Sequence, residues 1–336
     1  MTLRAPLAAA LLAITASAAA QAASTKPVLS VSKDSGQEFP SRIVRFVVPF
    51  PPGGATDVLA RALAVPMGRS LGHNVVVDNR TGGNTVIGTE AVFRAAADGH
   101  TMLVVAPSIS INPFVRSKLP YDTAKDFSAV ARLALSPLTI SVHPSVPAKS
   151  VAELISIART RPGELTFAVS SIIGGQRIAA ELFFRERAKV DIIAVPYNGG
   201  APAATAVIGG HTMILVSNLA EASQQIASKR LRGIAVMSLA RTAQLPNLPT
   251  VAESGYPGFE AANWYGVIIR SPTPRAIIER LSTEITKGLE SNEVRDNLTR
   301  FGLDIAYQNA ADFDAYIRNE MVRNERITKL LKLKID

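Results

Sequence analysis

The residues of this 336-residue chain that could do chemistry are glycines and small polar residues at the ends of predicted strands. In the clearest case, residues 48–57, a buried strand leads into Pro51, Pro52, two glycines and a helix. Prolines fix the path of the chain, and glycines let the backbone pass close to a ligand. The first amides of the helix have no partner within it and lie at the positive end of its dipole. The segment therefore predicts a site for a carboxylate or a phosphate.

The same segment also fits a tight strand-to-helix turn that binds nothing. Thr56 or Asp57 would then cap the helix, and Asp57 is better explained as a helix-start residue than as a ligand contact. Both interpretations stay open at this point. The predicted contacts of this first bend are Phe50, Gly53, Gly54, Ala55, Thr56 and Asp57.

A second bend, residues 195–202, repeats the pattern of the first. It again follows a predicted strand, with Val-Pro-aromatic and then Gly-Gly-Ala at the start of a helix. Two such helix starts facing each other across a cleft would hold an anion from both sides. The predicted contacts of this second bend are Tyr197, Gly200 and Ala201.

Small polar residues follow three other predicted strands. Ligands of open α/β sheets bind beyond the carboxyl ends of the strands, so these residues are well placed to contact a ligand. Ordinary turn chemistry explains each of them equally well. Phe50, Tyr197 and Trp264 could stack on an aromatic ligand or could instead pack the hinge and the core. The remaining predicted contacts are Ser108, Ser170, Ser171, Gly175 and Asn218.

The elements that must position these residues alternate along the chain. Short β-branched runs and amphipathic stretches follow one another, which is typical of mainly parallel sheets flanked by helices. Apolar residues at helical spacing follow the first bend until Gly72, and capping-box patterns stand at Ser150 and Thr250. Another helix is expected from Thr273, with Pro274 in its first position. Strands are expected at 43–48, 75–77, 101–106, 165–169, 192–195, 213–216 and 234–236, and further helices at 87–96 and near 293 and 313.

The length of the chain allows two domains of ordinary size, each with its own core. The stretches 138–147 and 255–259 are candidates for crossings between them. We therefore predict an α/β protein with one domain built from residues 39–140 plus 259–336. The other domain is predicted at residues 141–258.

The first residues are typical of a secretory leader. Arg4 supplies a positive region, residues 7–15 are apolar, and Ala-Gln-Ala at 20–22 offers a cleavage site. An anchoring helix is the alternative, but the apolar run is shorter than the roughly 20 residues that cross a bilayer. We expect a cleaved signal peptide at residues 1–22, a flexible lead-in at 23–38, and a protein located in the periplasm.

Composition argues against several other functions. The chain has no cysteine, which removes disulfides, thiolate metal sites and cysteine nucleophiles. Its net charge is +9, but the basic residues are scattered rather than arranged in a nucleic-acid-binding stripe. The densest basic group, residues 323–334, is typical of a solvated helix face. The four histidines lie far apart, and no base stands near a nucleophile, so we expect no metal, cofactor or catalytic residue.

Many ordered motifs resemble the extracytoplasmic receptors of tripartite tricarboxylate transporters, the Bug family. The first bend, continuing into Leu59, Ala60 and Arg61, carries the strongest match. The resemblance extends from about Arg42 to near the C-terminus. The other matching motifs lie at 77–80, 98–101, 112–113, 119–122, 142–145, 196–202, 248–253 and 264–266.

This resemblance implies a two-lobed flytrap fold that buries a small carboxylate between its lobes and delivers it to membrane permease subunits. It also implies that the carboxylate is held mainly by backbone amides, small hydroxyls and waters, at residues 53–57 and around Gly200 and Ala201. A monomer is expected, because such receptors work by hinge motion. Residues 81–86 and 170–176 depart from the family pattern and leave the identity of the carboxylate open. An exported enzyme acting on an organic acid, or a receptor feeding a signalling sensor, remains the alternative.

Overall fold

The structure of the protein, a computed structural model, describes residues 39–335. The predicted signal peptide and lead-in lie outside the described residues. The described part is an α/β fold of two lobes, with ten strands joined in one mixed sheet. The predicted fold class is therefore confirmed.

Lobe 1 is built around three parallel strands, β1 (Val44–Val48), β2 (Val75–Asn79) and β3 (Thr101–Val105). Neighbouring side chains of β1 enter different cores, because Phe46 and Val47 point to opposite faces of the sheet. The lobe contains a 3₁₀ turn at Gly83–Thr85 and the helices α1 (Ala55–Leu71), α2 (Val86–Phe93), α3 (Ser108–Val115), α4 (Thr123–Asp126), α9 (Arg275–Glu290), α10 (Asn292–Arg300) and α11 (Ala310–Leu330).

Lobe 2 has its own core around a second parallel set, in which β5 (Thr166–Val169) lies between β6 (Ile193–Pro196) and β7 (Ile214–Asn218). Phe167, Phe183 and Phe184 pack together on one face, and Val207 covers the other. The remaining elements are β8 (Arg232–Val236), α5 (Val151–Thr160), α6 (Gly175–Glu181) with a π-helical turn at Leu182–Arg187, α7 (Gly200–Ile208) and α8 (Leu219–Ala227).

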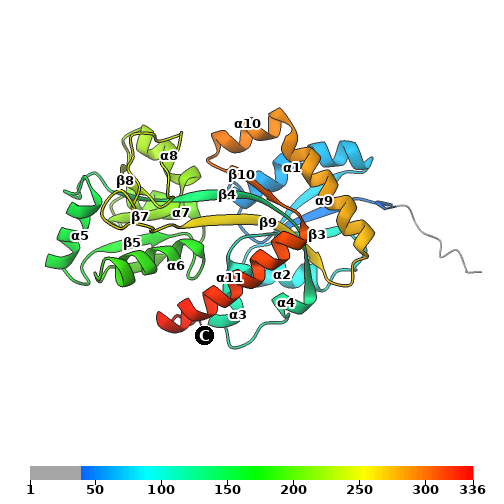
Figure 1. Cartoon of the computed structure of the whole chain (residues 1–336), viewed down its shortest axis with the longest axis horizontal. Coiled ribbons are helices and arrows are strands. Elements are labelled where there is room, and N and C mark those ends of the chain that lie inside the picture. The colour runs from blue at the N-terminus through cyan, green and yellow to red at the C-terminus, as the bar shows by residue number, and fades with distance from the viewer. Residues whose placement is uncertain (1–38, 336) are drawn as a thin grey trace, which may run out of the picture. The chain divides into compact units, whose positions relative to one another are not determined.

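Two long strands, β4 (Phe127–Val142) and β9 (Ala262–Arg270), connect the lobes (Figure 1). They pair antiparallel until Pro137 meets Ala262, and from Leu138 onwards β4 pairs with β7 and β8. β4 and β9 pair antiparallel because β4 runs from lobe 1 to lobe 2 and β9 carries the chain back to lobe 1. The sheet order is β2-β1-β3-β9-β4-β7-β5-β6, and β10 (Asp304–Gln308) also pairs with β4. The exact boundaries predicted for the two domains stay predictions.

Two predicted helix starts need correction. At Thr250 the capping bonds form, since the Thr250 amide donates to Glu253 Oε2 at 2.8 Å and the Glu253 amide to Thr250 Oγ1 at 2.9 Å. No helix follows, because Gly255 takes a left-handed conformation (φ 99°) and Pro257 comes next. Pro274 precedes α9 as its cap instead of occupying its first position.

The aromatic side chain of Trp264 belongs to the core of lobe 1. Its ring is 1% exposed and packs edge-on against Phe313 and Tyr316 of α11, with ring centroids 5.6 and 5.7 Å away. Its Nε1 donates to Glu320 Oε2 at 3.2 Å. Trp264 therefore packs the core, and its predicted alternative role in stacking on a ligand is wrong.

Replacing Trp264 by alanine should lower the free energy of unfolding by about 3–5 kcal/mol, because it empties a buried site between β9 and α11. Val322 on α11 is a matched control, since its side chain is 71% exposed and V322A should change stability by no more than about 0.5 kcal/mol. Urea unfolding followed by circular dichroism measures both, because Trp264 is the only tryptophan and its fluorescence is lost. A loss below about 1 kcal/mol for W264A would contradict the packing described here.

Candidate functional site

The two predicted glycine bends meet between the lobes. The first lies between β1 and α1 in lobe 1, and the second between β6 and α7 in lobe 2. A Cβ atom placed on Gly199 would lie 3.7 Å from Cγ of Pro51. Bends far apart in the sequence and carried by different lobes are therefore in contact.

Asp57 holds the first bend in shape. The amide of Gly53 donates to Asp57 Oδ2 at 3.0 Å, and Asn79 donates to Asp57 Oδ1 at 2.9 Å and to the carbonyl of Phe50 at 3.1 Å. Nε of Arg61 reaches Asp57 Oδ2 at 2.9 Å. Burial opposes ionisation of Asp57, but these hydrogen bonds outweigh it and lower its pKa. Asp57 is thus a structural brace, in agreement with its interpretation as a helix-start residue.

The first turn of α1 presents free backbone donors at this bend. The first bond of the helix joins the amide of Val58 to the carbonyl of Gly54 at 3.0 Å. The amides of Ala55 and Thr56 precede that bond, and the cap residue Gly54 has no side chain to accept from them. A Cβ on Gly54 would find only the carbonyl of Pro51 nearby, at 3.8 Å. The space above the helix start is therefore open.

Ser108, at the start of α3, serves a structural role. It accepts a hydrogen bond from Thr85 Oγ1 at 3.2 Å, while Asn84 and Asn112 exchange bonds of 2.9 Å. Asn84 and Thr85 both have positive φ, of 51° and 78°, which is strained for residues with side chains. Residues 81–86, the segment that departs from the family pattern, are thus held against α3 by side-chain hydrogen bonds.

In lobe 2, the loop after β5 supports the second bend. The Ser170 carbonyl accepts from the Gly199 amide at 2.8 Å, and the Ser170 amide donates to Gln176 Oε1 at 3.0 Å. The Ser171 hydroxyl donates to the carbonyl of Ile173 at 3.1 Å. Gly175 lies close against β9 and lobe 1, because a Cβ there would collide with the side-chain oxygen of Asn263 and lie 3.1 Å from Cγ of Pro107.

The start of α7 resembles the start of α1. Its cap, Gly199, has a left-handed φ of 118° and offers no side chain, and Pro202 has no amide hydrogen. The amides of Gly200 and Ala201 are therefore the free donors of the first turn. Tyr197 is half-buried against the small core under α7, and Phe50 against the core of lobe 1.

Glu221 on α8 is a residue that the sequence analysis missed. Its carboxyl group lies so close to Gly200 that a Cβ on Gly200 would collide with it. It accepts from the Asn218 amide (3.2 Å), Asn218 Nδ2 (3.0 Å) and Gln176 Nε2 (3.2 Å). Burial raises the pKa of Glu221, although these hydrogen bonds oppose the rise. The capping-box spacing from Asn218 to Glu221 was visible in the sequence, but nothing in the sequence linked it to Gly200.

Two polar residues of β9 extend this group. Nδ2 of Asn263 donates to Oδ1 of Asn218 at 2.7 Å and so links the crossing strand to α8. The Asn263 side-chain oxygen and the Tyr265 hydroxyl are buried, and neither has a hydrogen-bond partner among residues 39–335. Burial, and then the charge of Glu221, raise the pKa of Tyr265. The site therefore includes Gln176, Glu221, Asn263 and Tyr265 besides the predicted residues.

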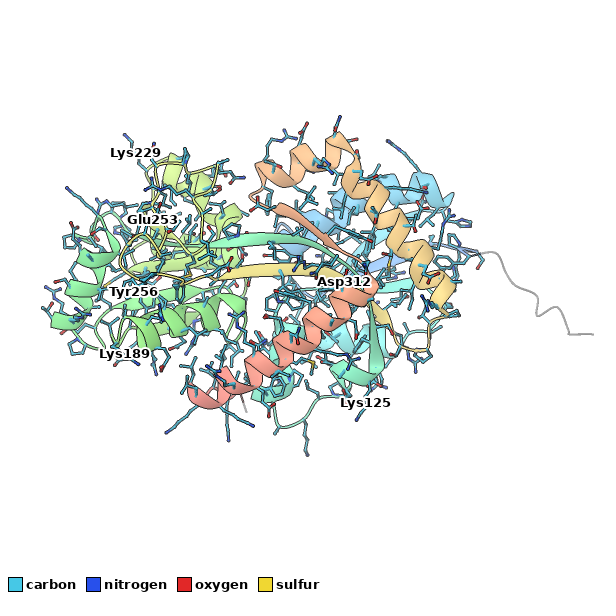
Figure 2. The ribbon with its side chains drawn as sticks, viewed as in Figure 1. Lys125, Lys189, Lys229, Glu253, Tyr256 and Asp312 are labelled. Carbon is cyan, nitrogen blue, oxygen red and sulfur yellow. The ribbon has the colours of Figure 1, made fainter. Side chains whose placement is uncertain are left out.

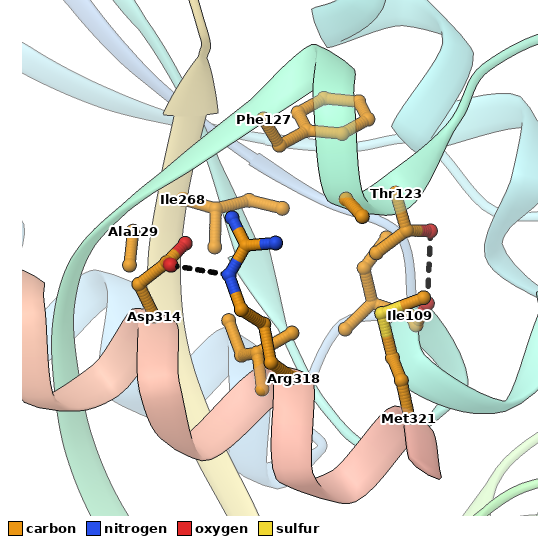
Figure 3. A pocket seen from close by; sticks show the side chains of 10 residues that line it. Ile109, Thr123, Phe127, Ala129, Ile268, Asp314, Arg318 and Met321 are labelled. Carbon is orange, nitrogen blue, oxygen red and sulfur yellow. Dashed lines mark hydrogen bonds and ion pairs between the residues drawn. The ribbon is translucent and has the colours of Figure 1, made fainter.

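A hollow of about 240 Å³ adjoins this site on the side of α11. Its lining includes Gly175 and Pro107 together with the charged residues Arg132, Glu320 and Arg323. A second hollow lies between α4, β4 and α11 (Figure 3). At about 10 Å³ it holds one water molecule at most, and it contains none of the predicted contacts.

Figure 2 places Lys125, Lys189 and Lys229 at separate edges of the described part. From residue 39 to residue 335 no helix combines the length and the apolar character needed to cross a membrane. In the same range, no three His, Asp or Glu side chains gather closely enough to hold a metal ion.

Two lobes joined by crossing strands, with the site at their junction, define the class of solute-binding proteins. The structure matches periplasmic binding protein BugD with a TM-score of 0.81 and 28% identity, over 88% of this chain and 99% of BugD. It matches an R. palustris protein solved with adipate (TM-score 0.82, 35% identity, 87% and 97% of the two chains). MatC from Rhodopseudomonas palustris, solved with bound malate, matches with a TM-score of 0.77 and 27% identity over 86% and 99%.

The family model described as the tripartite tricarboxylate transporter family receptor matches residues 59–333, and the chain belongs to this family. A UPF0065 protein from a Pseudomonas species is 38% identical over 269 residues, which is 80% of each chain. BugT of Bordetella pertussis is 36% identical over 263 residues, 77% of this chain and 80% of BugT. The resemblance to the Bug family is confirmed.

Replacing Asp57 by asparagine should cost about 1–3 kcal/mol of stability at pH 7, because Gly53 and Arg61 lose an anionic acceptor. The folded-state pKa of Asp57 lies below the ordinary 3.8. Its contribution is therefore complete well above pH 3.8 and is lost as the pH falls through the folded-state pKa. Urea unfolding at pH 7 and at pH 3 should show the gap between wild type and D57N narrowing at the lower pH.

The control for D57N is D314N. The pair of Asp314 and Arg318 is exposed, with side chains 39% and 57% accessible, so its loss should change stability by less than about 0.5 kcal/mol. A gap between wild type and D57N that does not change with pH would refute the bracing role of Asp57.

Proposed function

We propose that the chain captures a small carboxylate between its lobes and delivers it to the membrane subunits of a tripartite tricarboxylate-type permease. The observation that carries this proposal is the meeting of the α1 start with the bend before α7, where Gly199 approaches Pro51. Both helices begin at a glycine that supplies no side-chain cap; at α1 the first amides are available to an anion, whereas at α7 the carboxyl group of Glu221 lies against Gly200. Adipate in one related structure and malate in another support a carboxylate as the ligand.

Capture would work by closure of the lobes around the ligand. The strands β4 and β9 connect the lobes, so they would bend as the lobes rotate. A ligand held by the α1 amides and by the loops at Ser170 and Tyr197 touches both lobes. Because only the closed arrangement offers both sets of contacts, such a ligand shifts the population towards closure.

The polar side chains of the site support a binding role over a catalytic one. Asp57, Ser108, Ser171 and Asn218 all have structural partners within the fold. A covalent mechanism needs a base held against a nucleophile, and the proposed role needs neither. We propose a periplasmic monomer whose partners are the ligand and the permease subunits, and an exported enzyme remains the alternative.

Replacing Gly54 by valine should weaken carboxylate binding at least tenfold while leaving the fold intact. The φ of Gly54 is −82°, which valine can adopt, and the new side chain would point into open space at the α1 start. A ligand present at 100 times its Kd adds about 2.7 kcal/mol of stability, or a Tm rise of about 5 °C or more. A thermal-shift screen of mono-, di- and tricarboxylates should show such a rise for wild type, and G54V should weaken binding at least tenfold.

The matched control for G54V is A152V, which adds a similar bulk at the exposed start of α5. It should bind as wild type does. Gly200 is unsuitable for this test, because a side chain there would displace Glu221. Unchanged affinity in G54V would overturn the proposed site. Mass spectrometry of the ligand after incubation separates the alternatives, since a chemically altered ligand would indicate an enzyme.

Export is tested on the full-length chain expressed in a Gram-negative host. The proposal expects the protein in the periplasmic fraction, with N-terminal sequencing beginning just after Ala22. A chain recovered from the cytoplasm and still beginning at Met1 would contradict both the export and the proposed role.

A further inference from the structure

Glu221, which is half-buried, differs from the buried acidic side chains of the described structure. Asp57 pairs with Arg61, Glu181 with Arg177, and Glu284 with Arg280. Within residues 39–335, Glu221 forms no ion pair, and its carboxyl group is held by N–H groups of Asn218 and Gln176 alone. The described residues therefore supply no cation beside Glu221, and because burial raises its pKa, a cation placed there would favour its ionised form.

The capping role of Glu221 does not account for this charge. The side chain closes a capping box at the start of α8 by accepting from the Asn218 amide. Glutamine performs the same capping function without a charge. A carboxylate in low-dielectric surroundings is costly unless something compensates it.

The position of Glu221 shows what could provide the compensation. Its carboxyl group lies against Gly200, in the bend whose neighbour Gly199 approaches Pro51 of lobe 1. It therefore forms part of the lobe 2 wall of the proposed site. The Tyr265 hydroxyl, 97% buried and without a partner among the described residues, is close enough for the charge of Glu221 to influence it. A carboxyl group and a phenol hydroxyl thus lie together at one end of the site.

The two ends of the site consequently differ in charge preference. The α1 start in lobe 1 offers N–H donors and the positive end of a helix dipole, which favour a carboxylate. The Glu221 end supplies no cation for a second carboxylate, whereas a cation beside Glu221 would stabilise its ionised form, because opposite charges a few ångströms apart interact strongly away from bulk water. A dicarboxylate satisfies only one end, whereas an amino acid satisfies both.

We propose that Glu221 determines ligand class, and that the chain prefers a monocarboxylate carrying a cationic amine, with the carboxylate at α1 and the amine facing Glu221. This inference rests on the proposed function. In this proposal the Glu221 side chain of lobe 2 determines which class of ligand the site prefers. The Glu221 carboxylate then receives from the ligand the counter-charge that the fold does not supply.

The test compares ligands of equal length by isothermal titration calorimetry at pH 7.5, using the mature wild-type protein. The panel contains 2-amino and ω-amino monocarboxylic acids of three to six carbons and the dicarboxylates of the same lengths, such as 6-aminohexanoate with adipate. The tightest ligand should carry an amine and should bind at least tenfold more tightly than the matching dicarboxylate. In E221Q that ligand should lose at least tenfold in affinity, while the dicarboxylate should bind equally well or better.

The matched control is E253Q. Glu253 makes the same reciprocal capping bonds with Thr250, also in lobe 2, but pairs with Arg241 at the surface. E253Q should leave the ligand ranking unchanged, which separates capping from charge. If E221Q yields no folded protein, the wild-type ranking decides alone.

Three results would overturn the inference. A dicarboxylate as the tightest wild-type ligand would do so, as would an equal effect of E221Q on both ligand classes; either result leaves the proposed capture of carboxylates standing. If no member of the panel binds wild type, the proposed function fails, and the inference fails with it.

Discussion

Backbone N–H groups that have no acceptor are the feature on which the rest of this structure depends. A helix cannot satisfy the amides of its own first turn, and here two helices begin at glycines that cannot cap them. The surrounding residues keep these starts in place. Asp57 holds the first bend by accepting hydrogen bonds from Gly53 and Asn79. The Ser170 carbonyl holds the second bend by accepting from the Gly199 amide. The side chains thus build a frame, and the main chain provides the proposed binding groups.

The frame depends in turn on two strands that serve both lobes. Because β4 pairs with β9 in lobe 1 and with β7 and β8 in lobe 2, the lobes share hydrogen bonds as well as a connection. Asn263 on β9 reaches Asn218 at the start of α8. The two bends are therefore positioned by a continuous sheet, which limits how the lobes can rotate relative to each other.

Much of this arrangement could be predicted from local sequence. The strand-Pro-Pro-Gly-Gly-helix pattern identified the start of α1, and the repeated Gly-Gly-Ala identified the start of α7, because glycine and proline constrain the backbone locally. The length of β4 could not be predicted in this way. Both faces of this strand are largely covered, so it lacks the alternation of polar and apolar residues that marks a half-exposed strand. The role of Glu221 was also hidden, since its contact with Gly200 arises only when α7 and α8 pack against β7.

The place of β9 in the sheet has a consequence for how the chain folds. The core of lobe 2 uses residues 138–259, a nearly continuous stretch. Lobe 1 cannot complete its sheet in the same way, because β9 lies between β3 and β4 and is followed in the sequence by α9, α10 and α11. Contacts of such long sequence separation form slowly, because the two ends of the intervening stretch of chain must come together before any contact between them can stabilise the fold. The first lobe to be synthesised is thus the last to be finished, because β1, β2 and β3 must wait for a strand made near the end of translation.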